Sequence, residues 1–123
     1  MLRLFSEVRK RSVTMKEKSI TISGIEVPLK VSAYTPVLYS NLFNENIFAE
    51  MQNIITVAGQ TGTVPFEKVT VLYKLAYCMA KHADSSIPAF EEWLDQFDVY
   101  DIPAIAGELI GLWSADNQSQ STP

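Results

Sequence analysis

The residues best suited to chemistry are the only cysteine, Cys78, and the only histidine, His82. They are four residues apart, so a helix would place them on one side, as a nucleophile–base pair or as two metal ligands. A structural zinc ion needs four ligands, and no other cysteine or histidine exists in the chain. We interpret Cys78 as a small apolar residue of a buried helix and His82 as a cation at the helix C-terminus or a solvent-exposed side chain. The sequence predicts no catalytic residue, metal ligand or cofactor.

Two other patterns have a simpler structural explanation. The GQTGT segment, residues 59–63, lacks the lysine and the spacing of a phosphate-binding loop, so we predict a flexible loop over residues 58–63. An acidic run then follows, with Glu91, Glu92, Asp95, Asp98 and Asp101. We interpret it as the solvated face of a helix, which could attract a basic partner.

Charge divides the chain into two parts. Residues 1–18 hold six of the ten Lys and Arg residues and two acids, a net charge of +4, whereas the rest carries −8. An acidic body repels phosphates, so we expect no nucleic-acid partner. We expect residues 1–18 to be a flexible basic leader, with Met15 as an alternative translation start.

Membrane insertion and secretion are not expected. The chain has no stretch near the roughly 18 apolar residues of a membrane span, and its leader lacks the apolar run of a signal peptide. A single cysteine allows no internal disulfide, which favours a reducing cytoplasm. The 47% of hydrophobic residues is enough for one packed domain, which we place at residues 19–113.

The first predicted element is a β-hairpin over residues 19–31. Apolar residues alternate from Ile25 to Val31, and Ser23-Gly24 provides the turn because glycine tolerates positive φ. Pro28 has no N–H to donate, so we expect an unpaired strand edge there.

Helices are predicted for the remainder. Thr35 and Pro36 indicate a helix start, residues 44–46 a break, and residues 47–57 a second helix. The strongest prediction is a helix over residues 64–82, capped by Thr63 and apolar over most of its circumference, which we expect to be central. Two further helices are predicted over residues 87–97 and 102–113, capped by Ser86 and Asp101, and residues 114–123 are predicted to be a disordered polar tail. The fold class is therefore α+β and mainly α, with a short N-terminal β-hairpin followed by a bundle of about four to five helices.

Aromatic residues are the candidates for partner binding. Most should fill the core, but a domain of this size could expose some of them, and an exposed apolar surface marks a partner face. Our candidates for partner contact are Phe43, Phe48, Trp93 and Trp113.

The motifs resemble a known family. The hairpin sequence SITISGIEVPLKVSA, the helix ending LAYCMAKHA at residues 75–83 and the segment WLDQFD at residues 93–98 are similar to the tail assembly chaperones of long-tailed phages and prophages. The resemblance covers residues 19–113. It implies a non-catalytic protein that binds and solubilises the tape measure protein, helps to recruit tail tube protein and self-associates into multimers. It also implies the host cytoplasm as location and absence from the mature virion.

Two other classes of function stay open. One is a generic intracellular protein-interaction adaptor or regulatory subunit on a similar scaffold. The other is a small hydrolase or metal enzyme, which the lone Cys78 and the lone His82 disfavour.

Overall fold

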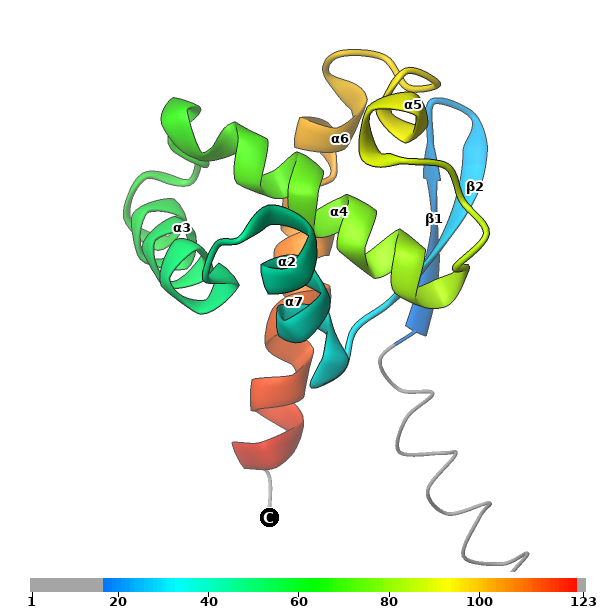
Figure 1. Cartoon of the computed structure of the whole chain (residues 1–123). Helices are drawn as coiled ribbons and strands as arrows, with labels where there is room; N and C mark the ends of the chain where they lie inside the picture. Colours follow the sequence, from blue (N-terminus) through cyan, green and yellow to red (C-terminus); the bar gives the residue numbers. More distant parts are fainter. Residues whose placement is uncertain (1–16, 122–123) are drawn as a thin grey trace, which may run out of the picture.

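The computed structural model describes the backbone of residues 17–121, and their side chains except those of Phe66 and of residues 115–121. A two-stranded hairpin is followed by a series of helices packed around one long central helix (Figure 1). The predicted class, α+β and mainly α, is confirmed. The described residues form six α-helices rather than four to five, because the last predicted helix is divided in two.

The hairpin consists of β1 (Glu17–Ile22) and β2 (Ile25–Lys30), which pair antiparallel with Ser19 opposite Pro28. Both turn residues have positive φ, 53° at Ser23 and 78° at Gly24, as a two-residue type I′ turn requires. One face of the sheet is buried and is formed by Ile20, Ile22, Val27 and Leu29. The predicted hairpin and its turn are therefore confirmed, whereas Ile25 is 37% exposed at the turn end.

Helix α2 (Tyr34–Phe43) begins earlier than predicted. Thr35 is not its cap: the hydroxyl of Ser32 accepts the N–H of Tyr34 at 3.1 Å, and the Thr35 hydroxyl accepts the N–H of Ser32 at 3.0 Å. Ser32 thus satisfies a free donor of the first turn. The helix ends where a break was predicted, at Asn44, which has a left-handed backbone.

Helix α3 (Ile47–Thr61) is longer than predicted. The Asn46 side chain caps it by accepting the N–H of Phe48 at 2.9 Å. The predicted loop over residues 58–63 is wrong for its first part, since the helix continues to Thr61. Gly62, with φ of 81°, ends it, because that conformation suits glycine at a helix C-terminus.

The central helix is α4 (Val69–Ala83), which contacts β2, α2, α5, α6 and α7. Its side chains are buried almost without interruption from Leu75 to Ala80, as predicted for a helix covered on several sides. The predicted start at residue 64, with Thr63 as cap, is wrong. A short 3₁₀ helix, η1 (Phe66–Lys68), precedes α4, and the carbonyl of Pro65, just before η1, accepts the N–H of Lys68.

Of the last two predicted helices, the first, over residues 87–97, is shorter than predicted, and the second, over residues 102–113, is divided in two. Helix α5 covers only Phe90–Leu94, because Tyr77 and Lys81 of α4 bind the carbonyls of Pro88 and Ile87 and hold that segment outside a helix. Ser86 caps no helix and donates its hydroxyl to Asp84 at 2.6 Å.

The last predicted helix is α6 (Asp101–Ala104) followed by α7 (Ala106–Ser121), with Ile105 between them in a non-helical conformation. Asp101 is the first residue of α6 rather than its cap. Its carboxylate accepts the hydroxyl of Ser23 at 2.6 Å, which ties the hairpin turn to this loop.

The predicted terminal segments are only partly described. Helix α7 extends through residues 114–121, where we predicted a disordered tail, since a helix already formed adds residues more readily than it starts. Residues 122–123 lie outside the described part. Of the predicted basic leader, residues 17 and 18 belong to β1, and residues 1–16 lie outside the described part.

Candidate functional site

Cys78 and His82 lie on α4, as the sequence predicted, but their surroundings differ. Cys78 is completely buried, and burial raises the pKa of its thiol to about 12. The thiol therefore stays protonated at neutral pH, and a protonated thiol is a poor nucleophile and metal ligand. This is the structural role that we predicted for Cys78.

His82 is half-buried, with its ring edge against the ring of Tyr34 at a centroid distance of 5.1 Å. Its Nδ1 atom is buried and has no hydrogen-bond partner among the residues that the structure describes. Burial, and secondarily the charge of Lys30, lowers the pKa of the imidazole. His82 is therefore not the fully solvent-exposed side chain that was one of our two predictions.

The other two sequence patterns do not form a site either. The GQTGT segment is the C-terminal end of α3, where the helix dipole repels a phosphate group. Glu91, Glu92 and Asp95 are exposed, as predicted for a solvated face. Among the residues that the structure describes, no three His, Cys, Asp or Glu side chains are placed to hold a metal ion together.

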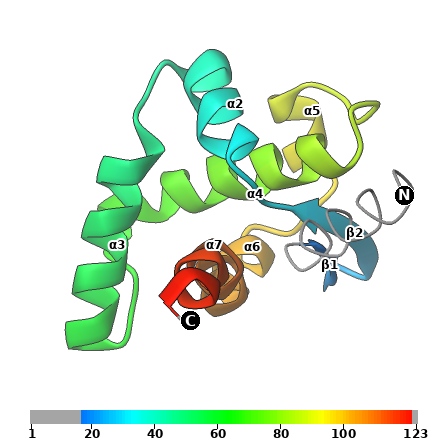
Figure 2. The same ribbon diagram turned by 90° about the horizontal axis from the view of Figure 1, so that it is seen from below.

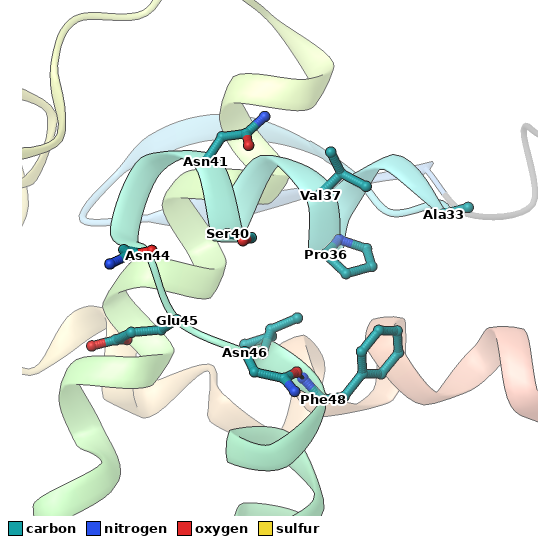
Figure 3. A pocket seen from close by; sticks show the side chains of 10 residues that line it. Ala33, Pro36, Val37, Ser40, Asn41, Asn44, Glu45, Asn46 and Phe48 are labelled. Atoms are coloured by element: carbon teal, nitrogen blue, oxygen red, sulfur yellow. Dashed lines mark hydrogen bonds between the residues drawn. The ribbon is translucent and has the colours of Figure 1, made fainter.

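The strongest candidate for a binding site is a groove of about 670 Å³ between α2 and the start of α3, called here the α2–α3 groove (Figure 3). Pro36 and Val37 of α2 form one side, and the Phe48 ring projects toward Pro36 from the other. Val37 is 50% exposed and Phe48 61% exposed, so both have apolar surface available to a partner. The complete lining is Ala33, Pro36, Val37, Ser40, Asn41, Asn44, Glu45, Asn46, Ile47 and Phe48.

The polar end of the groove is electrically balanced. The Glu45 carboxylate accepts hydrogen bonds from Lys74 Nζ at 3.0 Å and from the Tyr39 hydroxyl at 3.3 Å. Burial and the nearby Glu45 raise the pKa of Tyr39, so its hydroxyl stays a donor. The neutral amides of Asn41 and Asn44 add further donors and acceptors around the apolar part. A groove of this kind suits an apolar segment flanked by polar groups.

Two of the four aromatic candidates contact each other, and one of them, Phe48, lines this groove. The rings of Phe48 and Trp113 are 5.7 Å apart between centroids, although 65 positions separate them in the sequence. Trp113 comes from α7, is half-buried and packs against the exposed Phe48 ring, but it does not line the groove itself.

The other two candidates belong to the interior. Trp93 is only 2% exposed and packs between Tyr77 and Phe97, with centroid distances of 5.4 and 4.8 Å. It cannot contact a partner without opening the core, so we do not retain Trp93 as a proposed contact residue. Phe43 is half-buried against Phe90 at 5.0 Å. Neither residue lines the groove.

Sequence reasoning missed several exposed apolar residues. Helix α2 buries Leu38 but leaves its neighbour Val37 50% exposed. Two more exposed apolar residues lie in the loop before α6: Val99, which is 71% exposed, and Tyr100, which is 80% exposed. Their position between two short predicted helices, next to Asp98, was the available signal.

Comparisons with protein-family models, with curated proteins and with solved structures found no match to this chain. Within residues 17–121, no helix combines the length and the apolar character needed to cross a membrane. The geometry of the α2–α3 groove identifies the candidate site, and the sequence resemblance suggests its partner.

Proposed function

We propose that this protein is a tail assembly chaperone of a long-tailed phage or prophage, which binds the tape measure protein in the α2–α3 groove. The observation that carries the proposal is the open apolar groove with the exposed Phe48 at its mouth. The order of elements, a hairpin followed by a helical body with the motifs at residues 75–83 and 93–98, supports the choice of family.

The proposed client is an amphipathic helix. Such a helix presents apolar side chains at every third or fourth position, and a groove between two helices receives them as a row of anchors. Phe48 and Val37 would contact that row from opposite sides, while Asn41 and Asn44 would bind polar groups at its border. The proposed interaction needs no cofactor and no catalytic step.

The charge of the protein suits a holding role. A net charge of −4 favours solubility, because like charges oppose nonspecific aggregation of a protein that exposes an apolar binding surface. We propose that the protein acts in the host cytoplasm, helps to recruit tail tube subunits and is released before the virion is complete.

The first experiment is an affinity purification of the tagged chain from host cells during phage production, analysed by mass spectrometry. Recovery of one very long, largely helical phage protein, with or without tail tube protein, would support the proposal. Recovery of host regulatory proteins alone would favour the adaptor function instead.

The decisive experiment tests the groove directly. Helical segments of the recovered client are titrated onto the purified full chain, and the affinity is compared between the parent, Phe48→Ala and a control variant, Tyr100→Ala. Tyr100 is also an exposed aromatic, but it lies in the loop before α6 and does not line the groove. Equal affinities for all three proteins would overturn the choice of this groove.

A further inference from the structure

The two edges of the hairpin differ in their ability to bind another strand. In a type I′ hairpin, the residues that flank the turn, Ile22 and Ile25, exchange hydrogen bonds, and bonded and non-bonded pairs then alternate along the strands. Ser19 and Pro28 form a non-bonded pair, so their backbone groups point away from the partner strand. Pro28 therefore stands at an outward position of β2, where it has no N–H to offer.

The outer edge of β1 has no such block. By the same alternation, the N–H and C=O groups of Glu17, Ser19 and Thr21 point outward along the edge, while their side chains are exposed on the face of the sheet opposite the core. Within the described part of the chain, the sheet contains only β1 and β2, so no third strand pairs with this edge. Helix α4 packs on β2, and β1 lies on the side of the sheet away from α4 (Figure 2).

We propose that β1 pairs antiparallel with β1 of a second copy of this chain. A twofold axis through Ser19 places Ser19 opposite Ser19 of the other copy and Glu17 opposite Thr21. This register pairs all three outward residues and forms six backbone hydrogen bonds. It also keeps the two Glu17 carboxylates from facing each other, because each lies opposite a threonine.

Closure of the assembly favours a second copy over an unrelated strand. The resulting sheet has the order β2–β1–β1–β2, so both of its outer edges are β2 edges. Each outer edge carries Pro28, which blocks the addition of another strand. Pairing therefore covers the open β1 edge of both copies, and no third copy can be added to this sheet through a strand edge. This interface does not involve the α2–α3 groove and is independent of the proposed client.

The mass of the full chain in solution is the first test, measured by light scattering over a range of concentrations. We expect a monomer–dimer equilibrium. Ser19→Pro removes an outward N–H from each copy without touching the internal ladder, so two of the six hydrogen bonds are lost and the dissociation constant rises by about tenfold or more. Ser19→Thr, which keeps the N–H, should dimerise like the parent.

Cross-linking tests the register and does not depend on the proline variant folding. Ser19→Cys should form a covalent dimer on oxidation or with a short bis-maleimide, because opposite residues of a bonded pair are about 5.5 Å apart. Thr21→Cys alone should not, but a mixture of Thr21→Cys and Glu17→Cys should. The native Cys78 is buried and does not interfere. A chain that stays monomeric at the highest concentration reached, or a dimer unaffected by Ser19→Pro and not cross-linked at Ser19→Cys, would overturn the proposal.

Discussion

Replacement of Phe48 by alanine should weaken client binding strongly and folding only slightly. About 61% of the side chain is exposed, and an aromatic side chain presents roughly 200 Å², so about 120 Å² is available to a client. At about 25 cal/mol per Å², covering this area contributes about 3 kcal/mol. Alanine retains its methyl group, so we expect a loss of about 2 kcal/mol, or about a thirtyfold rise in Kd.

The cost to the fold should be smaller. Phe48 packs against Trp113, and such an aromatic pair stabilises by about 0.5–1.5 kcal/mol. The free energy of unfolding should therefore fall by about 1 kcal/mol, which leaves the protein folded. Urea unfolding measures the change in the free energy of unfolding. The fluorescence anisotropy of a labelled helical client segment measures Kd.

Tyr100→Ala is the matched control, since it removes an aromatic side chain that is even more exposed but lies outside the groove. Its Kd should stay within twofold of the parent. The reasoning would be refuted if Phe48→Ala also bound within twofold of the parent while folded, or if both variants weakened binding equally.

Three further outcomes are expected. Trp93→Ala should lower the free energy of unfolding by about 3–5 kcal/mol, measured by urea unfolding, because it empties a buried site between two aromatic rings. The Cys78 thiol should resist thiol reagents at pH 8 in the native protein and react rapidly in denaturant, because burial raises its pKa to about 12. His82 should make stability depend on pH: its pKa is lowered from 6.5 in the fold, so the unfolded chain binds the proton first. The free energy of unfolding that neutral His82 contributes above pH 6.5 should be lost as the pH falls toward the pKa of the folded state. Thermal melts over a range of pH measure this loss, and His82→Gln should remove the contribution of His82 to it.

The sequence predicted the elements whose signal is local. Ser23 and Gly24 indicate a turn that both residues then adopt with positive φ, and alternation places Val27 and Leu29 on the buried face. The central helix was also predictable, because a helix that is apolar on nearly all sides must be covered on several. These features depend on neighbouring residues alone.

Helix ends were less predictable because distant contacts decide them. Ser86 and Pro88 indicate a helix start, yet Tyr77 donates its hydroxyl to the Pro88 carbonyl at 2.7 Å and holds the segment outside a helix. Asp101 looks like a cap, but Ser23, 78 positions earlier, binds its carboxylate. No local pattern contains such partners.

The candidate site was predictable only in part. An excess of aromatic residues suggested a partner surface, and the structure places Phe48 at one groove, with Trp113 packed against it. Composition could not separate Phe48 from Trp93, since burial depends on which helices meet. Val37 becomes part of the groove only because α3 turns back beside α2 after Asn44.

The contacts between the hairpin and the C-terminal half have a consequence for synthesis on the ribosome. The hairpin is made early, but α4, which covers β2, is completed only at Ala83. At about 5–20 residues per second, the apolar face of the hairpin stays bare for roughly 3–10 s. The bond from Ser23 to Asp101 forms later still. A nascent chain therefore has to pass through an interval in which it needs protection itself, and a product truncated before α4 cannot bury its hairpin.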